Sequence, residues 1–230
     1  MLTRRCSQRQ FLLRPDAETN NAYLYCLLVA ALRFGVDVLL MCAMSNHHHL
    51  VIFDRDGRYP EFIEHFHKLL ARSQNALRGR WEHFWAAGQT SVVRLIDPED
   101  VLAKLVYVAT NPVKDDLVER AHQWPGINGY RALITTKPLR ATRPRHFFRP
   151  DGPTPAVVEA RLRLPSELGD VKRFLEALEQ QVRLRDTRDR DRRKRAMAIT
   201  ENAAWRSPKT RHGDHRKRAS RSAVEPIRVS

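Results

Sequence analysis

The chain has 230 residues and a formal net charge of +15, a length that suits one domain with a real core plus an appendage, or two small domains. No apolar run reaches transmembrane length, and four arginines interrupt the first fifteen residues, so we expect no signal peptide, no membrane partner and a cytoplasmic protein. The three cysteines form no Cys-x-x-Cys pair, which argues against a zinc ribbon and against a disulfide framework.

The positive charge is concentrated near the C-terminus. Residues 181–230 hold 16 Lys and Arg against 6 Asp and Glu, whereas the preceding 180 residues hold 25 against 20. Because dense positive charge attracts phosphate backbones, a nucleic acid is the natural partner of this tail. A solvated tail with no specific partner is the alternative.

The spacing of apolar residues predicts strands and helices in chain order from the N-terminus. The strands are expected at residues 2–13, 36–44, 48–53 and 91–96. The helices are expected at residues 17–33, 60–77 and 97–111. Asp16 should cap the first helix and Gly35 should end it, while Pro112 should end the third helix. The order β-α-β-β-α-β-α predicts an α+β, ferredoxin-like split βαβ fold, with an antiparallel sheet and helices on one face.

The rest of the chain lacks this alternation and divides by composition. We expect a folded domain over 1–134, a Pro/Arg-rich linker or arm over 135–165, a charged helix over 166–199 and a basic disordered tail over 200–230. A short strand near 157–164 would lie within the linker, and Ser166 would cap the charged helix.

A run of three histidines between two apolar stretches is the main chemical signal. Side chains alternate along a strand, so His47 and His49 point to one face and His48 points to the other. Two imidazoles about 7 Å apart along a strand can converge on one metal ion. Exposed histidines in a turn are the alternative, which the apolar flanks disfavour because a buried polar side chain is costly without a partner.

A second signal lies on the third expected helix. Tyr107 and Asn111 are four residues apart, so they share a helical face from which both could reach the histidines. An amide oxygen suits Mg²⁺ or Mn²⁺, and a phenol can act as a nucleophile. No other tyrosine has a ligand-type side chain four residues on. A packed core tyrosine beside a helix-ending asparagine is the alternative.

Both signals resemble one family. Met-Ser-Asn-His-His-His-Leu, from Met44 to Leu50, resembles the His-hydrophobe-His motif of HUH enzymes, and Tyr107–Val113 matches the Tyr-x-x-x-Asn-Pro-Val motif of the single-tyrosine transposases. The chain is most similar to the REP-associated tyrosine transposases, over about residues 2–132. It departs from the family at Ser45, where proline is usual, and at His48, where an apolar residue is usual.

The resemblance implies a ferredoxin-like domain that cleaves and rejoins single-stranded or hairpin DNA through a 5′-phosphotyrosine on Tyr107. It implies Mg²⁺ or Mn²⁺ held by His47, His49 and Asn111, in a bacterial protein that is nucleoid-associated when bound to DNA. Monomer and homodimer both stay open, because related transposases exchange the tyrosine helix between subunits whereas the REP-associated ones resemble monomers. Nucleic-acid contacts are expected from Arg4, Arg5, Arg9, Arg80, Trp81 and Trp85.

Two other functions stay open at this point. One is a non-catalytic nucleic-acid-binding protein with a degenerate HUH fold. The other is a metal-dependent hydrolase in which Tyr107 merely packs. A covalent protein–DNA adduct would separate the strand transferase from both.

Overall fold

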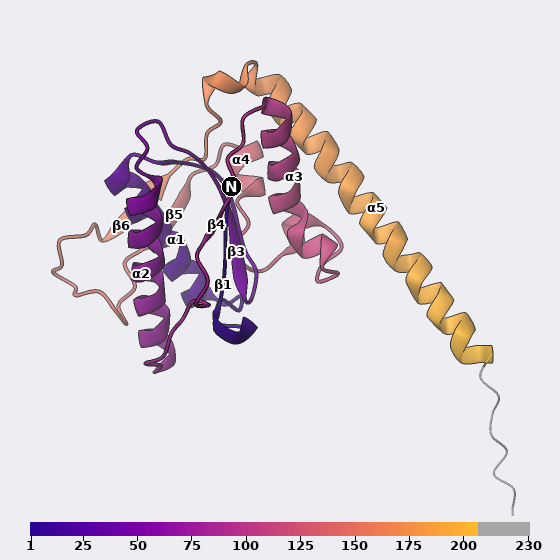
Figure 1. Ribbon diagram of the computed structural model, residues 1–230, viewed down its shortest axis with the longest axis horizontal. Coiled ribbons are helices and arrows are strands. Elements are labelled where there is room, and N and C mark those ends of the chain that lie inside the picture. Colours follow the sequence, from indigo (N-terminus) through magenta and orange to yellow (C-terminus); the bar gives the residue numbers. More distant parts are fainter. Residues whose placement is uncertain (207–230) are drawn as a thin grey trace, which may run out of the picture. The chain divides into compact units, whose positions relative to one another are not determined.

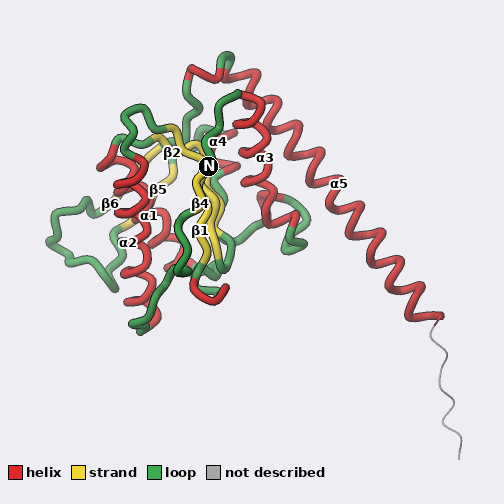
Figure 2. Tube along the Cα trace, in the orientation of Figure 1, coloured by secondary structure: helices red, strands yellow, loops and turns green. Residues whose placement is uncertain are grey.

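A four-stranded antiparallel sheet lies at the centre of residues 1–193, which form one compact unit. Its strands are β1 (Leu2–Arg5), β2 (Asp37–Ala43), β3 (His47–Phe53) and β4 (Ser91–Val92), in the order β2-β3-β1-β4. Figures 1 and 2 label these strands. The computed structural model describes the backbone of residues 1–206 and the side chains of residues 1–197. The α+β class and the antiparallel sheet expected from the sequence are confirmed.

Three helices cover the sheet, and they do so on two faces (Figure 1). They are α1 (Ala17–Phe34), α2 (Tyr59–Arg78) and α3 (Pro98–Lys114). His48 of β3 meets Tyr23 of α1 and Phe66 of α2, whereas the neighbouring His49 meets Tyr107 of α3. α1 and α2 therefore share one face, as expected for the ferredoxin-like arrangement, and only α3, which follows the last strand, lies on the opposite face. The reason is that β2 and β3 are apolar at consecutive positions, so both faces of the sheet need cover.

The helix ends follow local chemistry at most positions. Asp16 Oδ1 accepts from the backbone N–H of Thr19 at 2.6 Å at the start of α1. Gly35 ends α1 with a φ of 64°, a left-handed conformation that costs glycine little. The expectation that Pro112 ends α3 is wrong, because the helix continues to Lys114. Pro112 has no N–H to donate to the carbonyl of Val108, but the helix continues past it, and the N–H of Asp115 donates to the carbonyl of Asn111 at 3.1 Å.

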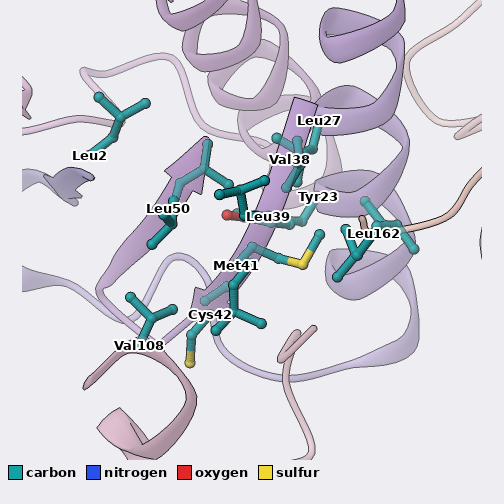
Figure 3. Packing of buried hydrophobic residues seen from close by; sticks show 14 of the residues in the cluster. Leu2, Tyr23, Leu27, Val38, Leu39, Met41, Cys42, Leu50, Val108 and Leu162 are labelled. Atoms are coloured by element: carbon teal, nitrogen blue, oxygen red, sulfur yellow. The ribbon is translucent and has the colours of Figure 1, made fainter. Parts of the chain in front are cut away.

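Buried apolar side chains fill the space on both sides of the sheet. Leu50 of β3 and Leu27 of α1 are fully buried, and burying such a side chain stabilises the fold by about 1.5–3 kcal/mol. Figure 3 shows Val108 of α3 near Cys42, at the end of the cluster away from Leu27. The three cysteines, Cys6, Cys26 and Cys42, are buried and free, as expected for a chain without a disulfide framework.

The segment 135–165, expected as a linker or arm, contains a two-stranded sheet that packs on α1. Its strands are β5 (Leu139–Thr142) and β6 (Val157–Ala160). Asn21 of α1 donates to the carbonyl of Thr142 at 2.8 Å, and its own carbonyl accepts from the N–H of Thr142 at 2.9 Å. Ala141 and Val158 are buried, and Leu139 and Ala160 of the same strands pack against the core, so the segment docks through its apolar side chains as well.

Short helices and one long helix complete the described chain. They are α4 (Tyr130–Ile134), α5 (Val171–Arg206) and three 3-10 helices at Ser7–Arg9, Ala121–Gln123 and Ser166–Leu168. α5 corresponds to the charged helix expected over 166–199, although it begins after Ser166. Residues 207–230 of the expected tail lie outside the described residues. None of the helices in the described chain is both long and apolar enough to cross a membrane.

Hydrogen bonds from two arginines of α5 join this helix to the end of α3. Arg192 donates to the carbonyl of Lys114 at 3.0 Å, and both Arg192 and Arg193 donate to Asp116 Oδ1. These side chains are partly exposed, so each ion pair contributes at most about 1 kcal/mol. Together they hold the residues that follow Asn111 in a defined backbone position.

Candidate active site

The three histidines of β3 alternate between the two faces of the sheet. The rings of His47 and His49 lie on the α3 face, with centroids 4.9 Å apart and planes at 83°. His48 is fully buried on the opposite face, where its ring contacts Phe66. The structure thus brings the first and third histidines together and separates the second.

Each histidine of the pair has its Nδ1 held by a neighbouring side-chain oxygen, and the Nε2 atom of His49 lies next to Asn111. His47 Nδ1 lies 2.7 Å from Asn46 Oδ1, and His49 Nδ1 lies 2.8 Å from Thr3 Oγ1. An amide oxygen can only accept, so His47 carries its proton on Nδ1 and leaves Nε2 as an acceptor. Thr3 can accept in the same way from His49. This is the arrangement of metal-binding histidines, whose second nitrogen donates to a nearby oxygen.

α3 places Asn111 and Tyr107 beside the histidines. Asn111 is buried, and its Nδ2 lies 3.4 Å from His49 Nε2. Its Oδ1 is also buried and has no hydrogen-bond partner. The half-buried ring of Tyr107 packs edge-on against His49, with centroids 5.2 Å apart. The expected face-sharing of these two residues therefore brings both to the histidine pair.

A divalent cation fits this set of donor atoms. A buried amide oxygen without a partner is costly, and coordination by a hard cation would satisfy it. Burial lowers the pKa of His49 to about 3, and burial also lowers the pKa of His47, so both imidazoles are neutral near pH 7, the form that binds metals. Among the side chains described, no group of three His, Cys, Asp or Glu could hold a metal ion, so a site here depends on the Asn111 amide.

The residues expected to contact nucleic acid fall on different faces. Arg5 pairs with His47 across β1 and β3, so its exposed side chain lies on the histidine-pair face. Arg4 lies on the opposite face, where its guanidinium is 3.2 Å from His67 Nδ1 and 5.5 Å from the centre of the Trp85 ring. Trp85 is buried, and its indole N–H donates to the carbonyl of His67.

The other three expected contacts are on the surface, away from strand β3. Trp81 is 96% exposed, which makes its ring available for stacking. Arg9 is exposed, and Arg80 is half-buried with one nitrogen 3.4 Å from Glu82. Asn46 links Arg9 to the histidine pair, because its Nδ2 donates to the carbonyl of Arg9 at 3.4 Å while its Oδ1 accepts from His47. No side-chain hydrogen bond in the described chain joins Arg80 or Trp81 to the pair.

Sequence reasoning did not find the buried polar network around His48. Arg4 donates to His67 Nδ1, so His67 carries its proton on Nε2 and donates to His48 Nε2 at 2.9 Å. His48 Nδ1 then donates to the hydroxyl of Tyr23 at 3.1 Å. The available signal was a histidine, His67, on the apolar face of a helix. Thr3 was also missed, because nothing in the sequence marks the strand neighbour of His49.

Comparison with known proteins gives one similarity. No family model matches the sequence, and no curated protein matches it either. Among solved structures, the chain is similar to a REP-associated tyrosine transposase bound to a REP hairpin, with 15% sequence identity and a TM-score of 0.46. The alignment covers 59% of this chain and 78% of that chain. At this identity and TM-score the similarity does not establish a family.

Proposed function

We propose that this protein is a metal-dependent DNA strand transferase that cleaves and rejoins single-stranded hairpin DNA through a 5′-phosphotyrosine on Tyr107. The observation that carries the proposal is that two imidazole rings, a buried amide whose oxygen has no hydrogen-bond partner and the ring of Tyr107 lie side by side where β3 faces α3. The motifs that resemble the REP-associated tyrosine transposases supply those same residues, and the positive charge of the chain suits a DNA partner.

The residues of the site would divide between metal binding and the positioning of the metal ligands and the nucleophile. The Nε2 atoms of His47 and His49, with Asn111 Oδ1, would hold Mg²⁺ or Mn²⁺. A divalent cation at this place withdraws charge from a phosphodiester and so makes the phosphorus easier to attack. Asn46 and Thr3 orient the two imidazole rings, and packing on His49 holds Tyr107 next to them.

The covalent step exchanges one phosphate ester for another. A bond forms between the Tyr107 oxygen and phosphorus, while the bond between phosphorus and the 3′-oxygen of the preceding nucleotide breaks. The phenolic proton passes to water, and the 3′-oxygen takes a proton from water to become a free hydroxyl. Attack by a 3′-hydroxyl on the phosphotyrosine reverses the step, so the strand is rejoined without an external energy source.

Replacement of Tyr107 by Phe tests the proposal, because it keeps the ring against His49 and removes only the nucleophile. We expect the variant to fold and to bind DNA but to form no covalent adduct on a denaturing gel with a labelled suicide hairpin and Mn²⁺. Adduct formation by the wild type should stop in EDTA and in a variant with Ala at both His47 and His49.

The outcomes also separate the competing functions. An adduct in the Tyr107→Phe variant equal to that of the wild type would place the nucleophile elsewhere. Cleavage by the wild type without any adduct would favour a metal-dependent hydrolase. Binding without cleavage would favour a non-catalytic nucleic-acid-binding protein.

A further inference from the structure

We infer that Lys114 and Arg5 form a phosphate subsite beside the histidine pair, and that its ligand is one phosphodiester of the bound DNA strand. This inference rests on the proposed function and adds a residue, Lys114, that neither the motifs nor the charge pattern singled out. It assigns the two cations to positioning the reacting phosphate rather than to general attraction of DNA.

Lys114 lies on the same helical face as the nucleophile and the amide. Tyr107, Asn111 and Lys114 are at positions i, i+4 and i+7 of α3, which is the spacing of one face. The ammonium nitrogen of Lys114 lies 5.1 Å from the centre of the Tyr107 ring. A cation at that distance is attracted to the ring face, so the side chain is drawn towards the phenol although it is exposed.

Arg5 approaches the same place from the sheet. As the cross-strand neighbour of His47, it extends from the face that carries the histidine pair. Lys114 reaches the same place through Tyr107, whose ring lies 5.2 Å from that of His49. The histidine pair therefore lies within reach of a positive charge from α3 and another from β1.

Neither charge is neutralised by a carboxylate. Lys114 and Arg5 form no ion pair with an acidic side chain in the described part of the chain. Asp116 is already paired with Arg192 and Arg193. Asp115, the next residue after Lys114, forms no ion pair with either cation, so two cations and one carboxylate leave the surroundings net positive.

The chemistry of the site selects a phosphodiester as the ligand. It carries one negative charge shared by two non-bridging oxygens, and attack by Tyr107 requires its phosphorus near the phenol. A flexible ammonium and an exposed guanidinium can follow that charge as the phosphate moves into position. The hydrogen bond from Arg192 to the carbonyl of Lys114 fixes the backbone from which the lysine reaches.

The test compares three alanine variants in a DNA-binding assay without metal. Lys114→Ala and Arg5→Ala probe the subsite, and Lys104→Ala is the matched control, a lysine of the same helix. Binding of a labelled oligonucleotide that folds into one hairpin with a single-stranded 5′ extension is followed by fluorescence anisotropy in EDTA over a salt series. We expect Lys114→Ala and Arg5→Ala each to weaken binding several-fold and to lower the salt slope by about one, while Lys114→Arg keeps both near wild type. Equal behaviour of Lys114→Ala and Lys104→Ala would overturn the inference.

The position of the bound phosphate in the oligonucleotide can be found by replacing one charged phosphodiester at a time with an uncharged linkage. A methylphosphonate is placed at each linkage of the oligonucleotide in turn. At one position the neutral linkage should weaken wild-type binding by the same factor as Lys114→Ala, and the two changes together should cost no more than either alone. The absence of such a position would refute a single phosphate subsite. If the wild type shows this pattern but forms no covalent adduct, the subsite stands and the proposed function is refuted. If the wild type does not bind the oligonucleotide, both the subsite and the proposed function are refuted.

Discussion

The buried network around His48 should make the fold sensitive to acid, and His67 offers the clearest measure of that effect. Burial, with the charge of Arg4 second, lowers the pKa of His67 from 6.5 to about 3. Between those values the unfolded chain binds a proton that the folded chain does not, so stability is full above pH 6.5 and falls as pH drops towards 3. At pH 5 the difference of 1.5 pH units corresponds to about 2 kcal/mol from this one histidine.

A variant that cannot titrate at this position isolates the contribution. His67→Gln keeps an acceptor for Arg4 and a donor for His48 but takes up no proton. We expect the free energy of unfolding, measured by urea titration in EDTA with tryptophan fluorescence, to fall between pH 7 and pH 5 by about 2 kcal/mol more in the wild type than in the variant. Histidines that do not contact His67 contribute equally to both proteins and cancel, and His48 stays neutral in both because burial is the main cause of its lowered pKa. An identical fall in both proteins would show that His67 is not held neutral by burial.

Two further predictions concern the metal and the tail. Thr3→Val removes the hydroxyl that orients His49 and keeps the branched shape, so Mn²⁺ affinity measured by calorimetry should fall about 10- to 100-fold; unchanged affinity would mean that Thr3 does not hold the ring. Deletion of residues 200–230, whose side chains the structure does not describe, should weaken DNA binding and flatten its dependence on salt concentration, and a salt slope equal to that of the full chain would contradict a phosphate-binding tail.

Features set by neighbours in sequence could be predicted from the sequence. The separation of His48 from His47 and His49 follows from strand alternation, and the pairing of Tyr107 with Asn111 follows from helical spacing. These patterns need no knowledge of distant contacts. They placed the candidate site on two elements, and the structure brings those elements together.

Features set by distant partners could not be predicted in this way. The side of the sheet on which α3 packs depends on which face is left open by α1 and α2. His67 becomes part of the core only because β3 brings His48 within 2.9 Å of it. The two-stranded sheet in 135–165 docks on α1 through partners more than a hundred residues earlier, such as Asn21, which offers both a donor and an acceptor to Thr142.

The burial of Cys42 turns this thiol into a natural reporter on the helix that carries Tyr107. Cys42 pairs with His49 across β2 and β3, so it faces α3, and Figure 3 shows Val108 of that helix near its sulfur. A thiol reagent reaches Cys42 when the cover that α3 provides opens, and burial raises the pKa of the thiol, which slows any reaction in the closed state. Its alkylation rate therefore reports how often α3, and with it Tyr107, moves away from the sheet. A lower rate with DNA bound would mean that the bound strand holds α3 against the sheet.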